Sequence, residues 1–455
     1  MIRLRKRIVC ALITALLLYA LPASAFDGGR YIVKFRDDAG IESAAETCGP
    51  FAVVGTQELR RLLADNALEW YEEDVPVTLS GADAELSGVL SPWYSDDMWH
   101  LDMIGAEAAY DQGATGAGIR VGVLDSGIAP HDAFADRLAE GWNYIDESAD
   151  TGDDFGHGTS VAGLIAGRTD EGFIGVAPDV TLVPLKCFKQ KSSKISNVIK
   201  GIYGGVDDYG CDILNLSLGF SENSLALRQA IDHAAEMGVL VVASAGNGGT
   251  AALSYPSAYD SVLGVGEAKS DGKVSLRSNH HAGVYMLAPG EKLTTPYYRG
   301  GYTESTGTSF SVPLVVGAAA AIWSAYPQLG AHDLMDLLGQ TATDGGDPGY
   351  DEYYGWGILN VRAALQAAKG WTPTAENVFM RLIGDAAAVW NKTSETLNVY
   401  LLAAEYDENG RQRTVSVTPL RLEPGGREVT PVHRGQTRLF LCDFAWRPLT
   451  APLDA

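Results

Sequence analysis

Apolar residues recur with two different spacings between about residues 119 and 369. Short apolar runs typical of buried strands alternate with longer segments in which apolar residues recur every three to four positions, as on a helix. Alternation of strands with helices predicts a mostly parallel sheet with helices on both faces, and in such sheets reactive groups collect at the carboxyl ends of strands. The expected strands are 119–124, 180–185, 212–218, 239–243 and 262–265, and the expected helices are 158–166, 194–206, 225–237 and 310–325.

Different patterns precede and follow this region. Upstream, short strands are expected at 31–35 and 68–74 with a helix at 58–63 between them, an α+β unit too small to bury much core without a partner surface. Residues 76–92 lose all periodicity and are rich in Gly, Ser and Ala, which predicts a linker. Downstream, residues 378–446 partly alternate apolar and polar side chains, which predicts a small antiparallel β-domain.

The first 25 residues have the three-part pattern of a secretory signal peptide. Four basic residues precede an apolar run from Ile8 to Leu21, and small residues at Ala23 and Ala25 suit cleavage after Ala25. The apolar run is short for a membrane span, although an uncleaved anchor is the alternative. We therefore expect a secreted protein, extracellular or associated with the cell surface, with no membrane span in its mature form.

Composition narrows the range of partners. A chain of 455 residues is expected to form two or three folding units. Its formal net charge of −23 should repel nucleic acids and anionic membranes, so no nucleic-acid partner is expected. The five cysteines show no CxxC pairing or metal-ligand spacing, which leaves either buried free thiols or a single bridge such as Cys187 to Cys211.

Three segments carry residues suited to acyl transfer. Asp125 ends a buried strand in VGVLDSG, His157 begins a helix of small residues in FGHGTSVAG, and Ser309 begins another helix in GTSFSVP. Each residue alone has an ordinary explanation as a turn former, loop residue or helix cap. Together they supply a nucleophile, a base that removes its proton and an anion that fixes the tautomer of the base.

A fourth residue fits the same chemistry. Asn247 follows an expected strand in VASAGNG. Asn before Gly is often a turn residue. Its side-chain amide, together with the backbone N–H of Ser309, could instead bind the negative charge that develops on a carbonyl oxygen during acyl transfer.

These four segments, in the order Asp, His, Asn, Ser, resemble the subtilisin family of serine proteases. The resemblance implies a subtilisin-like α/β fold and hydrolysis of peptide bonds in protein or peptide substrates, with Asp125, His157 and Ser309 as the catalytic triad and Asn247 as the oxyanion donor. It covers about residues 92–369. Further matches are GVAP at 175–178, ILNLSLG at 213–219, YPS at 255–257, LAPG at 287–290 and YGWG at 354–357.

The resemblance also implies how the chain binds substrate and matures. Ser217, Leu218 and Gly219 would pair with the substrate backbone as an added strand beside the specificity pocket. Residues 31–79 look like the inhibitor propeptide of subtilisins, whose end, around 71–74, would lie near the active-site cleft. We therefore expect a self-maturing precursor that carries its own intramolecular inhibitor and is cut somewhere between residues 75 and 97.

The chain departs from the family pattern in the cleft and in a loop. Ser311 stands where the family usually has Ala, and Phe220 follows Gly219 where many members have a second Gly, which could narrow or reshape the cleft. The loop 167–173 is short compared with members that bind calcium there, so calcium is doubtful at that position.

No metal-ligating residue and no obligatory cofactor are therefore predicted. Asp344, Asp347 and Asp351 could form a different calcium site, but a solvated loop explains them more simply.

The predicted organisation has four parts: a signal peptide at 1–25, a propeptide and linker at 26–91, a subtilisin-like catalytic domain at 92–370 and a C-terminal β-rich domain at 371–455. The predicted function is that of a secreted serine endopeptidase that forms an acyl-enzyme intermediate. A binding or adhesion protein on an inactive protease scaffold is the alternative from another class, motivated by the β-rich tail and Phe220. A processing protease dedicated to one peptide would differ only in specificity.

Overall fold

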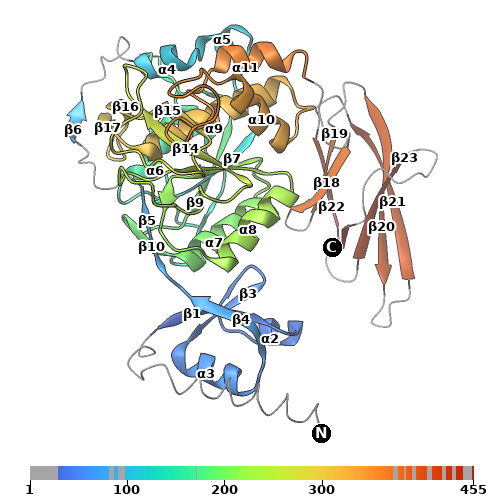
Figure 1. Cartoon of the computed structure of the whole chain (residues 1–455). Helices are drawn as coiled ribbons and strands as arrows, with labels where there is room; N and C mark the ends of the chain where they lie inside the picture. Colours follow the sequence, from blue (N-terminus) through green and yellow to red (C-terminus); the bar gives the residue numbers. More distant parts are fainter. Residues whose placement is uncertain are drawn as a thin grey trace. The chain divides into compact units, whose positions relative to one another are not determined.

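The computed structural model describes residues 29–80, 87–90, 98–170 and 172–371, together with the strands between 378 and 454 (Figure 1). The predicted signal peptide lies outside the described residues. The chain divides into two compact units, Met1–Val75 and Pro76–Ala455. This division falls inside the predicted propeptide and linker, and the four domain boundaries given above stay predictions.

The N-terminal unit is an antiparallel sheet with one well-formed helix. Its strand order is β2-β3-β1-β4, so that β1 is paired on both edges. Helix α3 packs Leu59 and Leu62 against apolar side chains of this sheet, including Val33 of β1. The elements are β1 (Arg30–Phe35), α2 (Asp38–Glu42), β2 (Thr47–Cys48), β3 (Phe51–Gly55), α3 (Thr56–Ala64) and β4 (Leu68–Glu73).

The second unit is built on a seven-stranded parallel sheet, which confirms the predicted fold class. The strand order is β15-β14-β13-β11-β7-β9-β8, and every pair of neighbours is parallel. Strands buried on both faces are apolar almost throughout, and this is why the apolar runs stood out in the sequence. The strands are β7 (Arg120–Asp125), β8 (Trp142–Asn143), β9 (Thr181–Lys186), β11 (Ile213–Leu216), β13 (Leu240–Ser244), β14 (Val262–Ala268) and β15 (Met286–Pro289).

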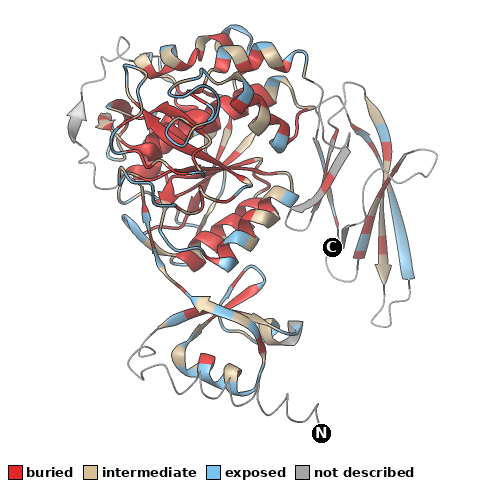
Figure 2. Ribbon diagram, viewed as in Figure 1, coloured by how far each residue is buried: buried red, intermediate tan, exposed pale blue. Residues whose placement is uncertain are grey.

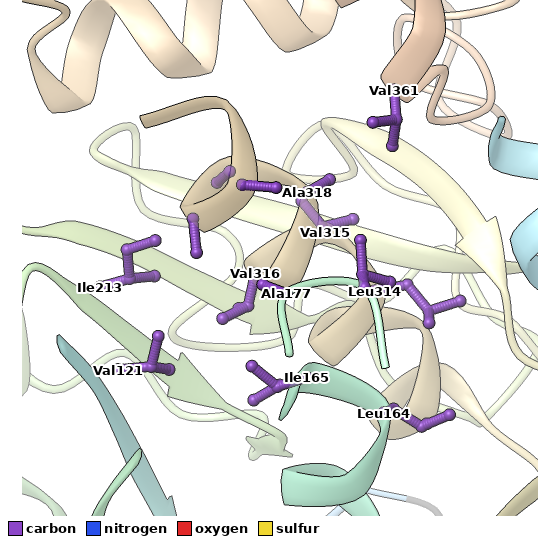
Figure 3. Packing of buried hydrophobic residues seen from close by; sticks show 14 of the residues in the cluster. Val121, Leu164, Ile165, Ala177, Ile213, Leu314, Val315, Val316, Ala318 and Val361 are labelled. Carbon is purple, nitrogen blue, oxygen red and sulfur yellow. The ribbon is translucent and has the colours of Figure 1, made fainter. Parts of the chain in front are cut away.

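Helices cover both faces of this sheet. Val121 and Val123 of β7 belong to the large apolar cluster formed with α6 and α9, seen for Val121 in Figure 3. Leu124 points the other way, because a Cβ added to Gly201 of α7 would lie 3.1 Å from its side chain. Successive side chains of a strand face opposite sides, so α6 and α9 cover one face and α7 the other. These helices are α6 (His157–Ala166), α7 (Ile195–Tyr203), α8 (Leu225–Glu236) and α9 (Thr308–Ala325).

Helix α9 lies at the centre of the core (Figure 2). All of its residues from Thr308 to Trp323 are buried, and it packs against α6 and four strands of the sheet. Among the described residues it is the one helix long and apolar enough to cross a membrane, with 89% of that window buried in the protein. Its composition is therefore explained by burial in the core. The remaining helices are α4 (Trp99–Ile104), α5 (Glu107–Asp111), α10 (Ala331–Thr341) and α11 (Val361–Ala368).

The prediction that residues 76–92 form only a linker was wrong. Strand β5 (Pro76–Leu79) pairs antiparallel with β10 (Ser192–Lys194) on one edge and with β12 (Leu218–Gly219) on the other. Strand β6 (Ser87–Leu90) pairs with β17 (Tyr302–Ser305), which also pairs with β16 (Leu293–Pro296). Segments of four residues show no periodicity of their own, and their partners lie more than a hundred residues away, so only the folded chain reveals them.

The C-terminal residues form two antiparallel sheets, as the alternating pattern predicted. The first has the order β18-β19-β22 and the second β21-β20-β23-β24. Inward-facing side chains such as Val389, Leu401 and Leu441 form a separate apolar cluster. The turns expected at 407–410 and 423–426 lie outside the described residues. The strands are β18 (Val378–Ile383), β19 (Ala386–Asn391), β20 (Leu397–Tyr406), β21 (Gln412–Leu422), β22 (Arg427–Pro431), β23 (Thr437–Asp443) and β24 (Leu453–Asp454).

Cys187 is a buried free thiol, so the bridge to Cys211 considered from the sequence does not form. Burial raises the pKa of the Cys187 thiol well above its ordinary value, with a smaller contribution from the charge of Asp125. A thiol in this state is protonated at neutral pH and unreactive.

Candidate active site

The end of β7 and the start of α6 bring Asp125 and His157 together. The Nδ1 atom of His157 lies 2.9 Å from each carboxylate oxygen of Asp125. Asp125 is fully buried and His157 is 3% exposed, and the backbone N–H of Ser126 donates to Asp125 Oδ1 at 2.7 Å. A carboxylate in this position keeps the proton on Nδ1 and leaves Nε2 to act on another group.

Glycine allows this close approach of helix to strand. A Cβ on Gly158 would overlap the carbonyl oxygen of Gly127 and lie 3.0 Å from Asp125 Cβ. Gly127 has φ +104°, a conformation that side chains rarely adopt. Gly127 and Gly158 therefore allow α6 to approach β7 closely enough for His157 to contact Asp125.

Asp153 holds the start of α6 and was not singled out from the sequence. Its Oδ1 accepts from the backbone N–H of Phe155 at 3.0 Å and of Gly156 at 2.8 Å, and its Oδ2 accepts from the N–H and hydroxyl of Thr159 at 3.0 and 2.6 Å. A carboxylate that satisfies the free N–H groups at a helix start is a familiar cap. The sequence feature that could have indicated this role is the position of an Asp four residues before His157.

Ser309 lies in the first turn of α9 and contacts a carbonyl oxygen of the chain itself. Its Oγ donates to the carbonyl oxygen of Ser80, and the Ser217 carbonyl oxygen is 3.2 Å away. The Nε2 atom of His157 lies 3.2 Å from the same Ser80 oxygen, and its ring packs on Phe310 with centroids 5.2 Å apart. The hydroxyl of Ser309 and the imidazole of His157 thus converge on one peptide carbonyl.

Asn247 lies against the same helix start with an unused donor. Its Oδ1 accepts from the backbone N–H of Thr308 at 2.9 Å and from the Thr308 hydroxyl at 3.1 Å, which fixes the orientation of the amide. Among the described residues, the buried Nδ2 atom of Asn247 has no hydrogen-bond partner. Buried donors are rarely left without an acceptor, so this N–H₂ group is suited to a ligand oxygen.

The segment predicted to bind substrate backbone does pair with an extended chain. Leu218 is in register with Leu79, Gly219 is in register with Thr78, and the backbone N–H of Ser80 donates to the Ser217 carbonyl at 3.1 Å. The expectation that the inhibitor segment ends around residues 71–74 needs correction, because β5 is the strand that pairs with β12, and Ser80 after it is the residue that contacts His157 and Ser309. Residues 71–73 belong to β4 of the N-terminal sheet.

The electrostatic environment of His157 favours its protonated form. Burial acts to lower the pKa of His157, but the charge and hydrogen bond of Asp125, the Ser80 carbonyl and the charge of Asp153 together raise it above the ordinary value of 6.5. An imidazole that is readily protonated beside a buried carboxylate is suited to accept a proton from a hydroxyl.

The structure shows the contacts of Phe220 and the burial of Ser311, the two residues that depart from the family pattern. Phe220 exchanges backbone hydrogen bonds with Tyr255, at 3.1 Å from Phe220 N to Tyr255 O and 2.9 Å in the other direction. Ser311 is fully buried, and its hydroxyl has no hydrogen-bond partner among the described residues. Phe220 therefore connects the end of β12 to the loop around residue 255, and Ser311 lies two residues after Ser309 inside the core.

The aspartates considered for calcium bind backbone groups of their own loop. Asp351 Oδ1 accepts from the N–H groups of Tyr353 at 2.7 Å and Tyr354 at 2.9 Å, and Asp344 Oδ2 accepts from Gly349 at 3.1 Å. Within the described part of the chain, no group of three or more His, Cys, Asp or Glu side chains could hold a metal ion. Calcium binding stays an open prediction.

The fold is that of a known class of hydrolase. Residues 116–357 match the Subtilase family, and the chain belongs to this family of serine-type endopeptidases. Among curated relatives, subtilisin DY of Bacillus licheniformis is 38% identical over 272 residues, which are 58% of this chain and 97% of that protein. Subtilisin Savinase of Lederbergia lenta is 34% identical over 270 residues, which are 59% of this chain and 98% of that protein. Minor extracellular protease Epr of Bacillus subtilis is 31% identical over 334 residues, which are 72% of this chain and 51% of that protein.

Proposed function

We propose that this chain is a secreted, self-maturing endopeptidase that uses Asp125, His157 and Ser309 as its catalytic triad. The observation that carries the proposal is the convergence of Ser309 Oγ and His157 Nε2 on the carbonyl oxygen of Ser80. A hydroxyl and an imidazole that lie at the same peptide carbonyl group supply the nucleophile and the base that acyl transfer requires. Secretion is inferred from the N-terminal signal pattern and from the extracellular relative.

In the proposed mechanism, His157 Nε2 removes the proton of Ser309 while Oγ attacks the carbonyl carbon of the substrate. The Asn247 Nδ2 group and the Ser309 N–H stabilise the resulting oxyanion. His157 then passes the proton to the leaving amine, and the peptide bond breaks to leave an acyl group on Ser309. Water, deprotonated by His157, then attacks the acyl group; the bond to Ser309 Oγ breaks, His157 returns the proton to Oγ, and the acyl group leaves as a carboxylic acid. Asp125 remains ionised and stabilises the imidazolium.

Protein and peptide substrates are proposed to bind as an added strand against Ser217, Leu218 and Gly219. The antiparallel pairing of β5 with β12 supports this proposal, because β5 is an extended segment on the same edge. Main-chain hydrogen bonds of this kind bind many sequences, and side-chain pockets then set preference. The chain's own residues before position 81 would act as an intramolecular inhibitor while they remain in place.

A fluorophosphonate probe tests whether Ser309 is an activated nucleophile. We expect the matured protein to be labelled on Ser309, as located by peptide mass mapping. The variant Ser309→Ala should lose the label, whereas Ser311→Ala, which removes the neighbouring buried hydroxyl, should keep it. Matured protein that folds normally but takes up no label would support the adhesion alternative and end the proposal.

Activity should fall as the pH is lowered, because the base must be neutral. His157 accepts a proton only in its neutral form, and its surroundings raise its pKa above 6.5, so protonation removes the base as the pH falls through that raised value. We expect kcat/KM on a peptide substrate to be on a plateau at alkaline pH and to decline with a midpoint at or above pH 6.5. Activity that rises steadily toward about pH 4, where an imidazole is charged, would contradict this role for His157.

A further inference from the structure

We infer that this chain cuts itself between Ser80 and Gly81, and that Ser244 and Ser254 narrow its specificity pocket so that it prefers a small side chain before the cut. The inference rests on the proposed endopeptidase function and adds to it a cleavage site and a substrate class. Sequence patterns left any bond between residues 75 and 97 open.

Hydrogen bonds to Ser80 identify the bond that is cut. Its carbonyl oxygen contacts Ser309 Oγ and His157 Nε2, and its backbone N–H donates to the Ser217 carbonyl at 3.1 Å. The residue whose carbonyl is attacked becomes the new C-terminus after hydrolysis. The proposed nucleophile therefore lies at the carbonyl group of Ser80, which assigns the cut to the bond that follows Ser80.

The four residues that end at Ser80 are held as a substrate would be. Strand β5 is paired on both edges, with Thr78 in register with Ser192 of β10 and with Gly219 of β12. Val77 and Leu79 are 1% and 3% exposed, whereas Thr78 between them is exposed. Val77 and Leu79 thus enter the protein, and Ser80, which follows the end of β5, is half-buried and contacts Ser244.

The side chain of Ser80 occupies a small polar pocket. Its Oγ lies 2.9 Å from the Oγ of Ser244, which also donates to the Leu218 carbonyl at 3.1 Å. A Cβ added to Gly219 would lie 3.4 Å from Ser80 Oγ and 2.7 Å from Ser254 Oγ. The hydroxyls of Ser244 and Ser254 therefore reach the space that a longer side chain in place of Ser80 would need.

Ser254 closes the space between two glycines and is held there by its backbone. Its Oγ lies 3.5 Å from the position of a Cβ on Gly246, so that it stands between Gly219 and Gly246. The Ser254 carbonyl accepts from Ser257 Oγ and from the Ala258 N–H, each at 2.9 Å. The neighbouring pairing of Phe220 with Tyr255 anchors the same loop, so Ser254 cannot easily move aside for a bulky side chain.

Self-cleavage gives the first test, with the full chain expressed in a protease-free host. We expect the released N-terminal fragment to end at Ser80 by mass spectrometry. Ser80→Phe should slow this cut by at least about tenfold, whereas Ser80→Ala should be cut at nearly the parent rate. Thr78→Phe is the matched control, because it adds the same bulk to an exposed position of the same strand. The assigned site would be overturned if the N-terminal fragment that is released first ended at a residue other than Ser80.

A peptide series gives the second test and separates the two proposals. We expect the matured enzyme to cleave acetyl-Val-Thr-Leu-Xaa-para-nitroanilide at least about ten times faster, in kcat/KM, when Xaa is Ser or Ala than when it is Phe. Ser254→Gly should raise the Phe to Ser ratio of kcat/KM by about tenfold, and Ser270→Gly, at an exposed serine outside the cleft, should not change the ratio.

The outcomes are distinct. Faster cleavage of the Phe peptide than of the Ser peptide by the parent enzyme, or an unchanged ratio in Ser254→Gly, would overturn the narrow pocket and leave the endopeptidase function standing. Failure of the parent to cleave any peptide of the series or to react with the fluorophosphonate probe would overturn the proposed function itself.

Discussion

Replacing Ser309 with alanine should leave the precursor uncut and lower kcat on peptide substrates by about six orders of magnitude. Removal of the nucleophile from a subtilisin-type triad costs about this much, because the remaining groups supply only binding and oxyanion stabilisation. The Ser80 carbonyl would remain in place with no hydroxyl to attack it. We expect gel electrophoresis and intact mass to show a chain that retains residues up to Ser80, while the parent chain loses them.

A trans-cleavage experiment controls for misfolding of this variant. Mature parent enzyme added to the Ser309→Ala precursor should remove the N-terminal segment and leave a stable domain of the same mass as the parent. Loss of the segment from Ser309→Ala at the parent rate, in a protease-free host without added enzyme, would show that maturation does not depend on this serine.

Replacing Asn247 with alanine should lower kcat by about 10²–10³ and change KM little. The side-chain amide has no acceptor among the described residues, although it is buried beside the start of α9. A donor of this kind gains its acceptor when the substrate oxygen becomes negative, so its loss raises the barrier without weakening substrate binding. Steady-state kinetics on the serine peptide described above would measure both constants.

A second substitution distinguishes loss of the donor from loss of the contacts to Thr308. Asn247→Asp keeps a carboxylate oxygen that can accept from the Thr308 N–H and hydroxyl, but it removes the N–H₂ group and adds a negative charge. We expect a loss of kcat at least as large as in Asn247→Ala, because the added charge opposes the oxyanion. Near-normal kcat in Asn247→Asp would exclude an oxyanion role and leave Asn247 as a residue that only positions Thr308.

The sheet and the proposed triad could be predicted because their signals lie in short stretches of sequence. Strand β7 has no polar side chain between Val121 and Leu124, so both the strand and Asp125 at its end are visible in the pattern. His157 stands between two glycines in the sequence, and the structure shows that Gly158 packs against Gly127. The pattern did not place every helix end: the helix expected over residues 194–206 ends at Tyr203, and a π-helical turn over Gly204–Asp208 follows it.

Features that depend on contacts between distant segments could not be predicted. Strand β5 owes its existence to two partners elsewhere in the chain, and PVTL alone has no periodicity that distinguishes it from a loop. The narrowing of the pocket depends on Ser244 and Ser254, which are ordinary polar residues until the fold places them beside Ser80. The capping role of Asp153 likewise requires the turn before α6 to be known.

The burial of α9 ties the chemistry of this enzyme to its stability. Ser309 belongs to a helix that is buried in the core, so the position of its hydroxyl depends on buried residues such as Val315 and Val316, which contact no substrate. Tightly packed interiors transmit small changes in volume. A substitution in α9 is therefore expected to affect two properties at once: the stability of the fold and the position of the Ser309 hydroxyl.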